Sequence, residues 1–186
     1  MKKFVVHRLF WNFEKEEKWL NQMASKGMNF IDYAFARYLF EQGTPGEFIY
    51  RIELLENLPD HPESLKYIEF MESVGVEHVG KWMRWIYFRK KASGGPFEIF
   101  SDYNSRIIHY KRISSLFCVA GVLNLFAFLL NTFNVITLDT KVDSRYFTYI
   151  LPLIFINGLL AGGFTWLFIK YRRKISRLKK EKQLYG

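Results

Sequence analysis

Apolar positions in this chain are concentrated in two uncharged runs in the C-terminal half, residues 113–138 and 146–169. Neither run contains Asp, Glu, Lys, Arg or His. A bilayer hydrocarbon core is about 30 Å thick and takes roughly 20 helical residues to cross. A core helix of a soluble domain carries a polar face, and a charged residue usually interrupts it within a few turns. The pattern therefore predicts transmembrane helices at 113–138 and 146–169, joined by an external turn at 139–145.

The residues before these runs show the mixed periods of an α+β domain. Asn12, followed by acidic residues, indicates the start of an amphipathic helix that ends near Gly27. A second helix begins near Pro62, where apolar residues recur at helical spacing at Leu65, Ile68, Met71 and Val74. Strands are predicted at 3–10, 28–40 and 47–55, the last two forming a hairpin, with a further strand or pair of strands at 76–91.

This order, βαββαβ, predicts a ferredoxin-like domain over residues 1–92, in which a four-stranded antiparallel sheet carries both helices on one face. Residues 93–112 are predicted to be a linker and a juxtamembrane helix. The fold class is thus α+β, followed by a two-helix transmembrane hairpin.

Charge places the two sides of the membrane. Residues 1–112 hold 17 basic and 15 acidic residues, whereas 170–186 hold 8 basic and 1 acidic, so the tail carries most of the formal net charge of +9. Because basic residues flank membrane spans on the cytoplasmic side, both termini are expected to be cytoplasmic, in a bacterial plasma membrane. The tail 170–186 is expected to contact lipid headgroups and not nucleic acid, and the residues predicted for this contact are Arg172, Arg173, Lys174 and Arg177. Tyr171, Ile175 and Leu178 recur at helical spacing, which predicts that the second helix continues into the tail.

Chemistry-bearing motifs are sparse. The four histidines fall in separate elements without ligand spacing, and the only cysteine, Cys118, lies within the first apolar run. We therefore predict no catalytic residue, no metal site and no cofactor, and enzyme is the least favoured class.

The residues that remain favour interaction surfaces. One face of the predicted sheet is expected to be uncovered, and it would present Arg37, Arg51, Glu53, Arg84 and Trp85. The alternative is that this face packs against the linker helix, lipid or a second copy. Within the membrane, Asn124 and Asn157 are expected to hydrogen-bond across the hairpin, and Gly158 and Gly162 to allow close helix approach.

Four short segments carry a resemblance to a known family. The segments RLFW at 8–11, EEKWLN at 16–21, KGM at 26–28 and YRIE at 50–53 resemble the DUF2812 family over about residues 3–112, although Met28 departs from the aromatic expected there. The resemblance implies a bacterial protein of unknown function with a cytoplasmic domain followed by hydrophobic segments. It also implies a regulatory context, because genes of such proteins often neighbour PadR-like regulators.

These observations predict a non-enzymatic, membrane-anchored adaptor or regulatory protein that binds lipid and a protein partner or a second copy of itself. Two alternatives stay open. One is a sensor of a small anionic ligand or peptide on the sheet face. The other is an accessory subunit of a larger membrane complex that acts through its hairpin.

Overall fold

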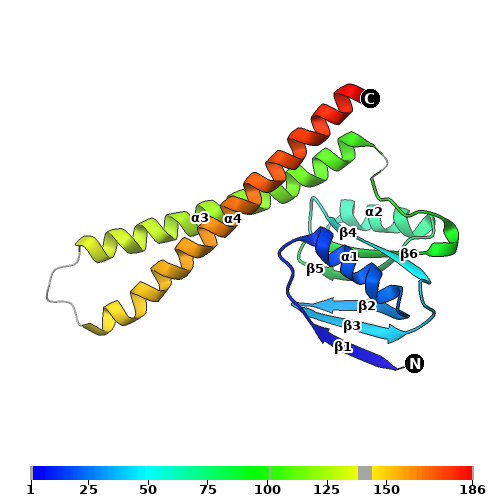
Figure 1. Cartoon of the computed structure of the whole chain (residues 1–186), viewed down its shortest axis with the longest axis horizontal. Helices are drawn as coiled ribbons and strands as arrows, with labels where there is room; N and C mark the ends of the chain where they lie inside the picture. Colours follow the sequence, from blue (N-terminus) through cyan, green and yellow to red (C-terminus); the bar gives the residue numbers. More distant parts are fainter. Residues whose placement is uncertain (1, 101, 138–143, 186) are drawn as a thin grey trace. The chain divides into compact units, whose positions relative to one another are not determined.

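The computed structural model describes residues 2–100, 102–137 and 144–185. The chain divides into two units, Met1–Ser101 and Asp102–Gly186 (Figure 1). The first unit is mixed α and β, and the second consists of two long helices. The predicted fold class of an α+β domain followed by two apolar helices is confirmed at this level.

The N-terminal unit contains six strands and two α-helices within the described residues. In chain order they are β1 (Lys3–His7), α1 (Phe13–Ala24), β2 (Met28–Ala34), β3 (Arg37–Gln42), β4 (Phe48–Leu54), α2 (Pro62–Ser73), β5 (Glu77–Trp82) and β6 (Trp85–Lys91), followed by the 3-10 turn η1 (Ala92–Gly94). They form two three-stranded antiparallel sheets, ordered β1-β3-β2 and β4-β6-β5. Each sheet is built from a strand–helix–strand–strand unit whose last strand lies in the middle. The N-terminal unit therefore consists of the same strand–helix–strand–strand arrangement repeated twice.

This arrangement differs from the single four-stranded sheet expected from the sequence. The run predicted as one strand at 28–40 is a hairpin, β2 and β3, which turns at Phe35 and Ala36. The predicted hairpin between that run and 47–55 is wrong, because β4 pairs with β6, with Tyr50 opposite Arg89. The turn contains no glycine, proline or asparagine, and the chain therefore gives no local sign that it reverses there.

Two hydrophobic cores hold the N-terminal unit together. The first lies between α1 and strands of both sheets, and its fully buried side chains include Leu20, Phe30, Phe40 and Tyr50. The sheets approach closely at Gly80 of β5, where an added Cβ would lie 3.4 Å from the backbone nitrogen of Tyr33 in β2.

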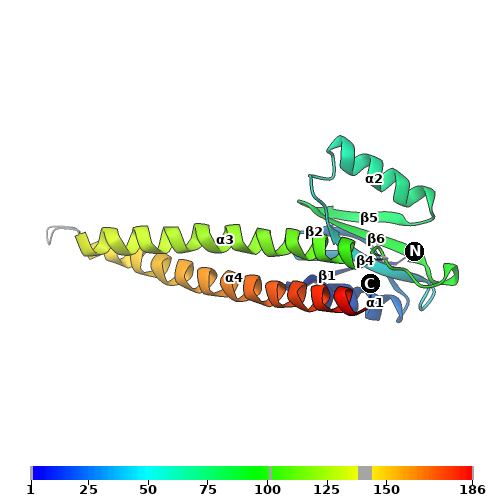
Figure 2. The same ribbon diagram turned by 90° about the horizontal axis from the view of Figure 1, so that it is seen from above.

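The second core lies on the other face of the β4-β6-β5 sheet, beneath α2. It contains Ile68 and Met71 of α2, Ile86 and Phe88 of β6, and Phe97. Figure 2 shows α2 beside β5 and β6, with α1 at the other side of this unit. The β4-β6-β5 sheet is therefore covered on both faces.

Helix α1 begins and ends as its sequence predicts. The Asn12 side chain accepts a hydrogen bond from the backbone N–H of Glu14 at 2.9 Å, and Gly27 adopts a φ of +76° after the last turn. The same helix also occupies the open edge of β4. Asn21 donates to the Tyr50 carbonyl at 3.0 Å and accepts from the Tyr50 N–H at 2.9 Å, while Glu17 accepts from the Ile52 N–H at 3.0 Å. Side chains of α1 thus satisfy backbone groups that a neighbouring strand would otherwise pair with.

The C-terminal unit is an antiparallel pair, α3 (Tyr103–Thr137) and α4 (Ser144–Tyr185). The helical continuation of the second apolar run into the tail is confirmed: Ile175 and Leu178 pack against Ile107 near the start of α3, and Tyr171 stacks on Phe117. Both helices contain a stretch long and apolar enough to cross a membrane. The predicted juxtamembrane helix begins at Tyr103, and residues 138–143 of the first run and the turn lie outside the described residues.

Candidate interaction surfaces

The five residues predicted to share an open sheet face do not lie together. Arg37 begins β3 in the first sheet, opposite His7. Arg51 and Glu53 lie on β4 in the second sheet. Arg84 lies in the β5–β6 turn, where its Nε donates to the Leu55 carbonyl at 2.9 Å, and Trp85 lies against Phe13 with ring centroids 5.7 Å apart.

The expectation of an uncovered face is also wrong for β4, for a physical reason. Arg51 and Glu53 pair opposite Phe88 and Ile86, which belong to the core under α2. That face is too apolar to remain in water, and α2 covers it. Glu53 is accordingly buried and accepts a hydrogen bond from the Tyr67 hydroxyl of α2 at 2.7 Å.

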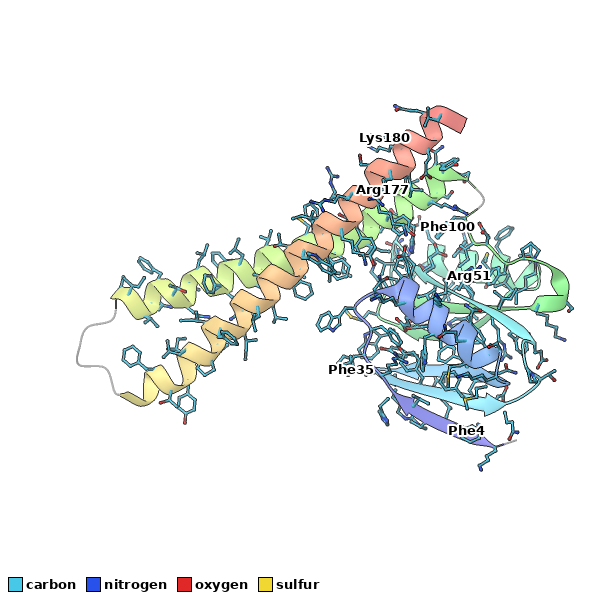
Figure 3. All side chains as sticks on the ribbon, viewed as in Figure 1. Phe4, Phe35, Arg51, Phe100, Arg177 and Lys180 are labelled. Carbon is cyan, nitrogen blue, oxygen red and sulfur yellow. The ribbon has the colours of Figure 1, made fainter. Side chains whose placement is uncertain are left out.

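Arg51 has a structural role that its position in the sequence did not indicate. Its Nη1 lies 3.4 Å from Glu17 Oε1 and donates to the Tyr50 carbonyl at 3.0 Å, and 28% of its side chain is exposed. Burial is the largest influence on Glu17 and raises its pKa, while the Ile52 N–H and Arg51 act in the opposite direction. Arg51 therefore braces the contact of α1 with β4. Figure 3 labels Arg51 in this unit.

A buried carboxyl group lies at the centre of the first core. Oε1 of Glu16 accepts hydrogen bonds from the hydroxyls of Tyr38 and Tyr87, both at 2.7 Å. Burial raises the pKa of Glu16, and the two hydroxyls lower it by a smaller amount. Burial and the neighbouring carboxyl raise the pKa of both tyrosines. The residues come from α1, β3 and β6, so the group ties both sheets to the helix.

Two exposed apolar surfaces were not predicted from the sequence. Phe70 and Val74, one helical turn apart at the end of α2, are 60% and 52% exposed; we call them the α2 pair. Val74 and Leu65 were expected to face the core with Ile68 and Met71, but both are exposed. The second surface comprises Leu9, Phe35, Trp82 and Met83, which we call the hairpin-tip patch. Its residues lie in turns or at their edges, where periodicity gives no information about exposure.

The helix pair uses only some of its predicted packing residues. An added Cβ at Gly158 would lie 3.2 Å from the ring of Phe128, so Gly158 faces α3, whereas nothing lies within 4 Å of one at Gly162. Asn124 donates to the carbonyl of Ala120 on its own helix at 2.8 Å. Because Gly121 faces Phe164 and Phe128 faces Gly158, the position opposite Asn124 falls near Ala161 and not at Asn157.

The predicted headgroup contacts lie on α4 beyond the apolar stretch. Arg172, Arg173 and Arg177 are exposed, and Lys174 lies over the Tyr110 ring at 4.5 Å. Figure 3 shows Arg177 and Lys180 on the last turns of α4. The apolar contact of this part of α4 with α3 is made by Tyr171, Ile175 and Leu178, while Lys174 contacts α3 from the side through Tyr110.

Comparison with known proteins identifies a family and nothing more specific. Within the described residues, no group of three or more His, Cys, Asp or Glu side chains gathers as metal ligands would. No curated protein and no solved structure matches the chain. The model of the family described as "Protein of unknown function (DUF2812)" matches residues 12–122, which include the α1 and β4 segments that carried the resemblance. The chain belongs to the DUF2812 family.

Proposed function

We propose that this protein is a non-enzymatic, membrane-anchored adaptor or regulatory protein of the bacterial plasma membrane. In this proposal α3 and α4 span the bilayer, the N-terminal unit and the basic tail are cytoplasmic, and the N-terminal unit presents a surface to a protein partner.

The observation that carries the proposal is the outward distribution of apolar side chains on α3 and α4. Large side chains remain exposed all along the pair, among them Leu123, Phe126, Leu129, Phe155 and Leu159. In water, this much contiguous apolar surface would drive aggregation, whereas in lipid it is the expected outer face of a spanning helix. The basic residues of 103–112 and 170–185 follow at one end of this apolar stretch, which supports a cytoplasmic location for that end.

The α2 pair supports the adaptor part of the proposal. Phe70 and Val74 lie on one flank of α2, while Ile68 and Met71 bury the opposite side in the core. Exposed apolar residues at i and i+4 are the anchors by which a helix docks into a groove of a partner. Lys66, one turn before Phe70, adds a charge at the rim of such a contact.

Site-specific photocrosslinking in living cells tests the adaptor proposal. A benzophenone amino acid at position 70 is expected to give a discrete adduct with one protein, identified by mass spectrometry. Leu65 is the matched control, because it is exposed on the opposite flank of the same helix. No adduct at position 70, or the same adducts at 65 and 70, would contradict docking at the α2 pair.

A further inference from the structure

We propose that the hairpin-tip patch is a membrane-contact site that enters the lipid headgroup interface. The inference rests on the membrane anchoring in the proposed function and goes beyond it, because it assigns the N-terminal unit a second, independent contact with the bilayer.

The patch gathers three separate stretches of chain at one end of the N-terminal unit. The β2–β3 and β5–β6 turns lie together, because the rings of Phe35 and Trp82 are 5.6 Å apart. The Arg8 N–H donates to the Ala36 carbonyl at 2.8 Å, which brings the segment containing Leu9 to the same end. Figure 3 shows Phe35 at the β2–β3 turn, far along the sheet from Phe4. Leu9, Phe35 and Met83 are 62%, 66% and 70% exposed, and Trp82 is 37% exposed.

The composition of these turns is unusual for turns that face water. Two-residue hairpin turns that need a positive φ normally use glycine, asparagine or aspartate. Here the turn residues are Phe35 and Ala36 in one hairpin and Met83 and Arg84 in the other, and Ala36 and Met83 adopt φ values of +60° and +52°. A long side chain at positive φ is strained. The β5–β6 turn therefore holds a long apolar side chain, Met83, at a positive φ, and the β2–β3 turn places the exposed ring of Phe35 beside Ala36, the residue that adopts the positive φ.

The surroundings of the patch match a lipid interface better than a purely apolar partner. Four basic residues adjoin the patch along the chain: Arg8, Arg37, Lys81 and Arg84. Arg37 is exposed, the Arg8 guanidinium lies over the Phe10 ring at 4.9 Å, Arg84 donates to the Leu55 carbonyl, and Lys81 is paired with Asp60 at 2.6 Å. Tryptophan at the boundary of apolar side chains, beside basic residues, is the composition that binds anionic headgroups. The chain also limits the distance to the bilayer, because only residues 92–112 separate β6 from the first apolar run.

Spin-label depth measurements on the full-length protein in vesicles of phosphatidylcholine and phosphatidylglycerol test the inference. In a Cys118→Ser background, single nitroxides are placed at Met83→Cys, Phe35→Cys, Leu125→Cys and Thr44→Cys. Oxygen concentrates in lipid and a nickel chelate concentrates in water. The ratio of their collision rates with a nitroxide therefore reports how deeply that nitroxide lies in the bilayer. Leu125 is exposed on α3 and reports the anchor, and Thr44 is exposed in the β3–β4 turn and is the matched aqueous control.

The expected result is a higher oxygen-to-nickel ratio at positions 83 and 35 than at 44, increasing when the anionic lipid is present. A lipid-like ratio at 125 with water-like ratios at 83 and 35 would overturn the inference while leaving the anchor intact. A water-like ratio at 125 would instead overturn the proposed anchoring. Immobile labels at 83 and 35, shielded from both reagents, would show that protein covers the patch and would also overturn the inference.

Discussion

At the residue scale, the buried carboxyl of Glu16 makes the stability of the N-terminal unit depend on pH. The acidic residues after Asn12 place negative charge in the first turn of α1, which favours the helix there. No local pattern indicates that Tyr38 and Tyr87 enclose Glu16, because these residues come from strands far along the chain. Burial of a single side chain by distant elements is not encoded in local periodicity.

The pKa of Glu16 predicts a pH dependence of stability. Because burial raises its pKa in the folded state above the ordinary value of 4.5, folding favours the protonated form. The contribution of protonated Glu16 to the free energy of unfolding is fully present below about pH 4.5 and is lost as pH rises through the pKa of Glu16 in the folded state. We expect Glu16→Gln, which keeps an acceptor oxygen for both tyrosines, to gain thermal stability relative to wild type as pH rises from 4.5 to 8.

Thermal unfolding of the full-length protein in detergent, followed by tryptophan fluorescence, measures this difference. Burial lowers the pKa of His78, so the stability that neutral His78 contributes to the folded state is lost as pH falls. His78 is present in both proteins, and its effect therefore cancels in the comparison. Glu69→Gln, at an exposed position of α2, is the control and should track wild type at every pH. A pH-independent difference between Glu16→Gln and wild type would show that Glu16 does not titrate in this range.

The ion pair of Arg51 with Glu17 gives a second prediction at the residue scale. A charge reversal, Arg51→Glu, would place two carboxylates together at the edge of β4, because Glu17 lies 3.4 Å from the Arg51 guanidinium. We expect a lower melting temperature for Arg51→Glu than for Arg37→Glu, which changes an exposed arginine at the start of β3. Equal melting temperatures would mean that Arg51 does not brace the contact of α1 with β4.

At the element scale, the sequence predicted most helices and apolar runs but only part of the sheet topology. The N-cap Asn12, the first-turn proline Pro62 and the two uncharged runs are local signals, and each corresponds to a helix in the structure. The reversal at Phe35 and Ala36 carries no such signal, so the sequence predicts one strand where the structure has β2 and β3. Pairing of β4 with β6 joins residues far apart in the chain, from Leu54 with Trp85 to Phe48 with Lys91, and no local pattern specifies which strand is the partner.

The α3–α4 contact gives a prediction with an internal control. A leucine at Gly158 would clash with the Phe128 ring, whereas one at Gly162 meets open space. Overpacking of this kind typically costs about 1–3 kcal/mol. We expect Gly158→Leu to weaken the α3–α4 contact and Gly162→Leu to leave it unchanged. In a Cys118→Ser background, crosslinking by a bifunctional maleimide between cysteines introduced at Asn104 and Lys182 reports the pairing in membranes, because the Lys182 Nζ donates to Asn104 Oδ1 at 2.8 Å in the paired helices. Equal crosslinking in both variants would contradict this register.

At the scale of the whole molecule, the proposed topology depends on charge at the two ends of the spans. Positively charged segments are retained on the cytoplasmic side. In a Cys118→Ser background, a membrane-impermeant maleimide should label Thr140→Cys in intact cells. Thr44→Cys and Ser176→Cys should react only after permeabilisation. Labelling of Ser176→Cys but not Thr140→Cys in intact cells would reverse the orientation, and labelling of all three would argue against spanning helices.

The side-chain pairing of β4 by α1 has a consequence for a protein confined to a surface. Anchored copies meet one another in two dimensions, where their effective concentration is high, and an unpaired strand edge would invite strand exchange between neighbours. Asn21 reproduces both hydrogen bonds of a strand partner at Tyr50, so that edge is closed to another chain. In the proposed membrane topology, the helix that completes the core therefore also keeps the β4 edge of each copy from pairing with a strand of a neighbouring copy.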